Sequence, residues 1–160
     1  MVLSNNDGCI IARSEEANAL GFAMDDPSHL HRDTLTRHGV HVFSSNYALY
    51  GDMSRRIIDT LADHTPEIER YSIDKVFLNL AGFERRGLAH YAQQIRATVR
   101  PHTGIPVSID LGPTRTLAKS RPDSGGVYDL TEVDADHALA SLEVGEVWGG
   151  GRRGAAWLDA

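Results

Sequence analysis

The residue best placed to do chemistry is Asp74, in the segment Tyr71-Ser72-Ile73-Asp74-Lys75. Apolar patterns on either side predict two strands, over residues 67–73 and 76–80, joined at this segment. A carboxylate beside apolar strands needs a hydrogen bond, an ion pair or a metal ion. Asp74 is therefore either a turn aspartate or a metal ligand, and both interpretations stay open at this point.

A second candidate segment is Gly112-Pro113-Thr114-Arg115-Thr116-Leu117-Ala118-Lys119. It predicts a turn that leads into a helix, on which Arg115 and Lys119 lie one turn apart. Backbone amides and cations at such a place can bind phosphate, although the spacing differs from that of a P-loop. The alternative is a capped helix with solvated cations.

A glycine turn followed by arginines, Gly149-Gly150-Gly151-Arg152-Arg153, lies near the C-terminus. It is either the hairpin of a helix-hairpin-helix, whose amides hold a DNA phosphate, or a plain turn. The eight histidines are scattered, so a histidine-built metal centre is not expected. The single cysteine, Cys9, excludes an internal disulfide and is expected to be a small core residue.

The charge balance counts against nucleic-acid binding for the chain as a whole, because 16 Lys and Arg residues face 22 Asp and Glu residues, a net charge of −6. The balance is reversed between Arg85 and Arg121, where Asp110 is the one acid. The basic residues there are Arg85, Arg86, Arg96, Arg100, Arg115, Lys119 and Arg121. This excess indicates either a surface for a polyanion or a solvated basic face.

The elements that must position these residues alternate between strands and helices. Strands are predicted over residues 2–4, 9–12, 40–44, 67–73, 76–80, 105–111 and 127–130, and helices over 14–20, 26–39, 46–64, 88–99 and 135–142. The helix over 46–64 is expected to bury one stripe, formed by Leu49, Met53, Ile57 and Leu61. This order predicts an α+β fold with a mixed sheet and packed helices. No apolar run reaches the ~20 residues of a membrane span, so no membrane contact and a cytoplasmic location are expected.

Taken together, the segments resemble the Y-family DNA polymerases of the UmuC type. The matching stretches are VLSNNDGCIIARS (2–14), FSSNYALY (43–50), DMS (52–54), YSID (71–74), GPTRTLAK (112–119), GGV (125–127), DL (129–130), VWG (147–149) and GRR (151–153). Their order and rough spacing also agree with the family, over nearly the whole chain.

The resemblance implies translesion DNA synthesis in the SOS response to DNA damage, by nucleotidyl transfer with Mg²⁺ held by carboxylates. It implies that residues 1–45 are fingers-like and include the end of a palm strand, that 46–130 are palm-like, and that 131–160 begin a helical thumb. The carboxylate of Asp74 matches a family metal ligand. The residues implied to bind nucleotide or phosphate are Arg13, Arg115 and Lys119, and those implied to bind DNA are Gly149, Gly151 and Arg152.

The chain departs from the family where the chemistry would occur. Lys75 replaces the family's third carboxylate, and a cation so close to a Mg²⁺ site repels the metal. The family's first metal-binding aspartate falls before Met1, and most of its thumb and its DNA-gripping domain fall after residue 160. We therefore expect Mg²⁺ binding to be weak or lost and the chain not to polymerise DNA.

Three functional hypotheses follow. The chain is an inactive fragment of a UmuC-like polymerase, a non-catalytic module that binds primer–template DNA or a UmuD-like subunit, or a relic without a selected function. Binding that weakens as salt rises distinguishes the second hypothesis, because phosphate contacts are screened.

Overall fold

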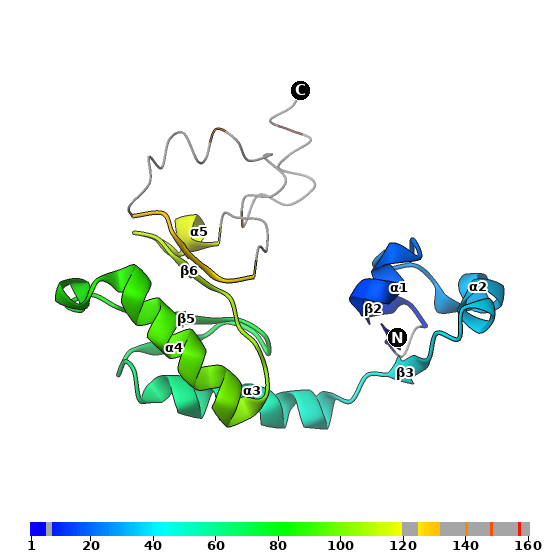
Figure 1. Cartoon of the computed structure of the whole chain (residues 1–160), viewed down its shortest axis with the longest axis horizontal. Coiled ribbons are helices and arrows are strands. Elements are labelled where there is room, and N and C mark those ends of the chain that lie inside the picture. Colours follow the sequence, from blue (N-terminus) through cyan, green and yellow to red (C-terminus); the bar gives the residue numbers. More distant parts are fainter. Residues whose placement is uncertain (6–7, 120–124, 132–139, 141–147, 149–156, 158–160) are drawn as a thin grey trace. The chain divides into compact units, whose positions relative to one another are not determined.

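The computed structural model describes residues 1–5, 8–119, 125–131, 140, 148 and 157. Its chain divides into two compact units, Met1–Tyr50 and Gly51–Ala160, and each is described by itself. Both combine short strands with helices (Figure 1), as the predicted α+β class requires. In the described part of the chain, no helix combines the length and apolar composition needed to cross a bilayer.

Three short strands form a mixed sheet in the first unit, in the order β2-β1-β3. β1 (Val2–Ser4) pairs antiparallel with β2 (Ile10–Arg13) and parallel with β3 (Val42–Ser44). Asn5 closes the β1–β2 connection: its backbone N–H donates to the carbonyl of Cys9 at 2.9 Å, and its Oδ1 accepts the N–H of Cys9 at 3.0 Å. The predicted strand–turn–strand start of the chain is confirmed.

Helical segments cover this sheet and complete the first core. α1 (Glu15–Ala19) is capped by Ser14, whose hydroxyl accepts the N–H of Ala17 at 3.4 Å. A 3₁₀ turn (Ser28–His31) and α2 (Arg32–Arg37) follow in place of the single predicted helix. The buried core residues of the unit are Val2, Ile10, Ala17, Phe22 and Leu35.

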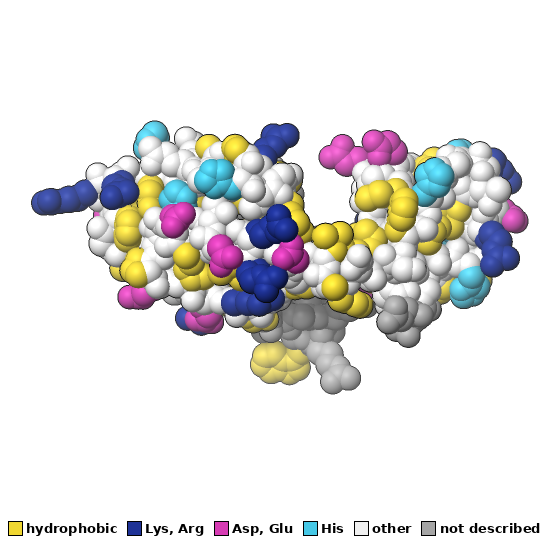
Figure 2. All heavy atoms as spheres, turned by 90° about the horizontal axis from the view of Figure 1, so that it is seen from below, with side chains coloured by type: hydrophobic (Ala, Val, Ile, Leu, Met, Phe, Trp, Pro, Cys, Tyr) yellow, Lys and Arg dark blue, Asp and Glu magenta, His cyan; other side chains and the backbone are white. Residues whose placement is uncertain are grey.

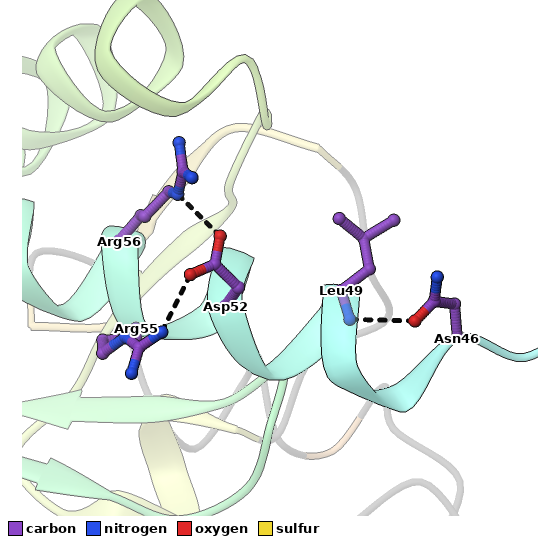
Figure 3. A network of polar contacts seen from close by, with 5 residues as sticks. All are labelled: Asn46, Leu49, Asp52, Arg55 and Arg56. Atoms are coloured by element: carbon purple, nitrogen blue, oxygen red, sulfur yellow. Dashed lines mark hydrogen bonds and ion pairs between the residues drawn. The ribbon is translucent and has the colours of Figure 1, made fainter.

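The long helix α3 (Tyr47–Ala62) crosses the division between the units. The side chain of Asn46 accepts a backbone N–H of its first turn at 3.0 Å, and Asp52 accepts hydrogen bonds from Arg55 and Arg56, each at 2.8 Å (Figure 3). The Arg55 and Arg56 guanidinium groups lower the pKa of Asp52. Such solvent-exposed pairs within one helix are screened by water, so they support α3 without anchoring it.

The predicted apolar stripe of α3 is buried only at its C-terminal end. Leu61 is 4% exposed, whereas Leu49 is 51% exposed, and Met53 and Ile57 are half-buried. The prediction of one continuous buried stripe is wrong, because only Ile57 and Leu61 reach the core of the second unit.

That second core forms between α4 (Leu88–Thr103) and a hairpin of β4 (Ile68–Arg70) and β5 (Val76–Leu78). The predicted helix is present as α4, and it buries one face formed by Tyr91, Ala92, Ile95 and Val99. The half-buried hairpin residues that pack against this core are Ile68, Val76 and Leu78. A fully buried side chain such as Ile95 contributes about 1.5–3 kcal/mol, so this face holds the hairpin in place.

α4 extends beyond its predicted end at Val99 and contains Pro101. A proline in the last turn removes a single backbone donor, and two contacts close the turn around it. Thr103 Oγ1 donates to the carbonyl of Val99 at 2.8 Å, and the N–H of Gly104 donates to that of Arg100 at 2.8 Å. Gly104 has φ +75°, which favours glycine, so the helix ends one residue before it.

The segment that carries Arg115 lies between two parallel strands, β6 (Ile109–Leu111) and β7 (Val127–Asp129). Thr114 caps the short helix α5 (Arg115–Ala118). A Cβ on Gly112 would lie 2.7 Å from the backbone nitrogen of Ala118, so the turn passes close against α5. Only glycine allows the turn to approach the C-terminal residues of α5 this closely.

Several strands of the second unit are shorter than predicted. The strand expected over 105–111 covers Ile109–Leu111, and that over 67–73 covers Ile68–Arg70. Among the described residues, the strands form one three-stranded and two two-stranded sheets. The predicted helix over 135–142 falls largely outside the described residues.

Replacing Gly112 with alanine tests the close approach to α5. We expect Gly112→Ala to lower the free energy of unfolding by about 1–3 kcal/mol, because the added methyl overpacks the turn. The matched control is Gly51→Ala, inside α3 with open space around it, which should stabilise by about 0.5–1 kcal/mol. Urea unfolding measures both, and equal effects of the two variants would contradict the close approach.

Candidate functional site

The tip of the β4–β5 hairpin brings Asp74 and Lys75 together. The backbone N–H groups of Tyr71 and Ser72 both donate to the carbonyl of Lys75, at 3.1 and 3.0 Å. These two hydrogen bonds to one carbonyl close the turn and fix the backbone that carries Asp74 and Lys75.

Both oxygens of the Asp74 carboxylate have partners within this turn. Oδ1 accepts the hydroxyl of Ser72 at 2.6 Å, and Oδ2 accepts the ammonium of Lys75 at 3.0 Å. The Ser72 hydrogen bond, supported by Lys75, holds the pKa of Asp74 below its ordinary value, against a smaller opposing effect of burial. Asp74 is therefore an ionised, hydrogen-bonded turn aspartate that is 64% exposed.

These residues do not fit a magnesium ion. Mg²⁺ takes near-octahedral oxygen ligands, usually including one or two carboxylates. Here a single carboxylate is paired with an ammonium, which repels a divalent cation. Among the residues that the structure describes, no group of three His, Cys, Asp or Glu side chains is arranged to hold a metal.

The hairpin has two chemically different faces, because side chains alternate along each strand. Glu69 lies directly opposite Phe77 in the register, on the face away from Ile68 and its core partners. Tyr71 packs edge-on against Phe77 on this outer face, with ring centroids 5.9 Å apart. The ring of Trp148 packs against both, and its centroid lies 5.2 Å from that of Tyr71 and 5.6 Å from that of Phe77. The outer face thus combines aromatic rings with charged side chains.

Arg115 lies on this outer face. Its Nη1 donates to Oε1 of Glu69 at 2.7 Å, and its Nη2 pairs with Oε2. The guanidinium carbon also lies 5.6 Å from the centre of the Phe77 ring. Arg115, predicted to bind phosphate, connects α5 to the hairpin in this structure.

The other predicted phosphate ligands differ in their surroundings. Lys119 is the C-terminal cap of α5 and makes no ion pair with any described residue. Arg13 belongs to the first unit, where its Nε donates to Oδ1 of Asn18 at 2.8 Å. The predicted DNA-binding residues Gly149, Gly151 and Arg152 lie outside the described residues.

Some basic side chains between Arg85 and Arg121 contact other groups of the same chain. The guanidinium of Arg86 lies 5.4 Å from the Phe83 ring and 5.1 Å from the Tyr91 ring. Arg96 Nε donates to a backbone carbonyl at 2.8 Å. The face shown in Figure 2 likewise carries basic side chains interspersed with acidic ones. Arg86 and Arg96 therefore already make contacts within the molecule.

Sequence reasoning missed Glu69 as a site residue. It is 46 residues from Arg115 along the chain, and nothing in either segment points to the other. The available signal was the alternation Glu69–Tyr71, which places both side chains on one face of the predicted strand.

Comparison with known proteins agrees with the resemblance predicted from the motifs. The model of the impB/mucB/samB family matches residues 1–121. The protein UmuC of Salmonella typhimurium is 42% identical over 170 aligned positions, which cover all of this chain and 40% of the relative. MucB of Escherichia coli is 40% identical over 164 positions, covering 95% of this chain and 38% of the relative. The chain thus spans about 40% of the length of these relatives.

Solved structures share the fold. An insertion ternary complex of Dbh DNA polymerase matches with a TM-score of 0.83 and 21% identity, over 98% of this chain and 49% of the other. DinB from Sulfolobus solfataricus matches with a TM-score of 0.76 and 24% identity, over 99% and 48%. The α+β fold predicted from the sequence is confirmed.

Substitutions at the hairpin tip test the cause of the low pKa of Asp74. Ser72→Ala and Lys75→Gln should each raise this pKa toward its ordinary value of 3.8, because each removes a hydrogen bond that favours the ionised carboxylate. Since the folded-state pKa lies below the unfolded one, the stabilisation is complete above pH ~4 and is lost as pH falls through the folded value. Carbon-13 NMR titration of the Asp74 carboxyl measures the shifts, and an unchanged pKa in either variant would contradict the corresponding cause.

Proposed function

Because this chain belongs to the impB/mucB/samB family of Y-family DNA polymerases, we propose that it binds primer–template DNA as part of a UmuC-type translesion polymerase and does not itself transfer nucleotides. The family match and the shared polymerase fold support the DNA-binding part. The pairing of Asp74 with Lys75 supports the absence of nucleotidyl transfer.

Residues 1–45 act as fingers, 46–130 as palm and 131–160 as the beginning of the thumb in this proposal. The near-complete coverage of the chain by polymerase structures supports such an assignment. The β4–β5 hairpin then belongs to the palm, the part in which the family carries its metal-binding carboxylates. The resemblance also implies a UmuD-like subunit as the protein partner of this module.

The positive charge of Lys75 opposes metal-dependent catalysis at this site. Nucleotidyl transfer in the family depends on Mg²⁺ held by carboxylates, and the residue beside Asp74 has the opposite charge to the one required. Its ammonium lies 3.0 Å from Asp74 Oδ2, at an oxygen that a metal would use. Removing a metal ligand commonly costs several kcal/mol of transition-state stabilisation, and each 1.36 kcal/mol is a tenfold loss in rate.

DNA binding in this proposal depends on a few cations. Arg13 and Lys119 are the described candidates that make no ion pair with an acidic side chain in the described part of the chain. A net charge of −6 opposes a polyanion over longer distances. We therefore expect weak, salt-sensitive binding.

Primer extension tests the absence of nucleotidyl transfer. With Mg²⁺ and all four deoxynucleotides, the chain should extend a primer no more than its Asp74→Ala variant does. The matched variant is Lys75→Glu, which replaces the cation beside Asp74 with a carboxylate. Extension gained by Lys75→Glu would identify the ammonium as the block, whereas template-directed extension by the unmodified chain would overturn the proposal.

Fluorescence anisotropy with labelled primer–template DNA tests the binding. If Arg13 and Lys119 each neutralise one phosphate, affinity should fall about tenfold between 50 and 200 mM salt. Lys119→Gln should weaken binding and make the salt dependence shallower, because one counterion fewer is released. An absence of binding at 50 mM salt would remove DNA as the partner.

A further inference from the structure

The Arg115–Glu69 pair is unusual among the described ion pairs because it joins distant segments. The pairs of Asp52 with Arg55 and Arg56, and of Asp74 with Lys75, lie within single elements or turns. Arg115 instead reaches from α5 to the middle of β4. Two parallel contacts between guanidinium and carboxylate fix the geometry of the pair.

The surroundings hold the Arg115 guanidinium in one place. Glu69 and Phe77 are cross-strand partners, so a single guanidinium contacts both members of one pair. The Thr114 cap fixes the start of α5, and the close approach of Gly112 holds the preceding turn against its last residues. Arg115 is therefore oriented on the outer face with its charge balanced by Glu69.

Glu69 offers Arg115 the same chemistry that a phosphate would. Both are anions with paired oxygens that match the guanidinium fork. The side chains of Arg115 and Glu69 are 59% and 47% exposed, so a ligand can reach the pair. An exposed pair of this kind is held only weakly in water, which lets a second anion compete with it.

We propose that Glu69 is a built-in competitor for Arg115, displaced when a phosphate of a bound polyanion takes over the guanidinium. This inference deepens the DNA binding proposed above and rests on it for the identity of the polyanion. Glu69 weakens phosphate binding twice, because it occupies the donors of Arg115 and because its own charge repels the incoming anion. Displacement also releases the link between α5 and the hairpin.

The neighbouring acid provides a matched control. Glu67 precedes Glu69 by two residues, and its Oε2 accepts the side-chain amide of Asn79 at 2.6 Å. Glu67→Gln and Glu69→Gln remove the same charge from nearby positions, but only the second frees Arg115. A difference between them therefore measures competition for Arg115 rather than net charge.

The test compares affinity for primer–template DNA, by anisotropy, and for inorganic tripolyphosphate, by calorimetry. Glu69→Gln should bind both roughly two- to fivefold more tightly than the unmodified chain, the range expected when one exposed ion pair is removed. Glu67→Gln should change affinity less. Arg115→Gln should weaken binding, and the double variant Glu69→Gln/Arg115→Gln should show no gain over Arg115→Gln alone.

Several results would overturn the competition. These are unchanged or weaker binding by Glu69→Gln, equal gains in Glu67→Gln and Glu69→Gln, a gain that persists without Arg115, or no binding of either ligand by any variant. If DNA fails to bind but Glu69→Gln gains affinity for tripolyphosphate, the proposed DNA partner is wrong and the competition holds.

A measurement on the unmodified chain covers the case in which Glu69→Gln does not fold. The Nε–Hε signal of Arg115 in nitrogen-15 NMR, assigned by its loss in Arg115→Gln, reports directly on the guanidinium. Addition of tripolyphosphate should shift this signal progressively until it saturates. An Arg115 signal that does not move while tripolyphosphate binds elsewhere would also overturn the competition.

Discussion

The packing of the β4–β5 hairpin against α4 is the constraint on which the rest of the site depends. Its inner face is apolar and joins the core around Ile95 and Val99. Because side chains alternate along a strand, burying this face commits Glu69 and Phe77 to the other one. A register shift of one residue would reverse the two faces, so the core determines which charges reach the surface.

Charge pairing then decides what those surface residues can do. Asp74 has the residue type of a metal ligand but is satisfied by Ser72 and Lys75. Arg115 has the residue type of a phosphate ligand but is balanced by Glu69. At Asp74 the internal partner is a cation, as a metal ion would be. At Arg115 it is an anion, as a phosphate would be.

The two pairs differ in how readily a ligand can replace the partner. Lys75 follows Asp74 directly in the turn, so the backbone keeps its ammonium within reach of the carboxylate. Glu69 lies on a different element from Arg115 and can separate from it by side-chain movement alone. This difference supports the proposed combination of lost metal chemistry and retained, adjustable phosphate binding.

Much of the fold followed from the sequence alone, because periodicity and capping act locally. The helices α3 and α4 and the β4–β5 hairpin around Asp74 are examples. The partner of Arg115 and the exposure of Leu49 depended on segments distant in the chain. Local sequence patterns indicate which residues are apolar or charged. Only the tertiary structure decides which of them are buried or paired, because the contacting groups come from segments distant in the chain.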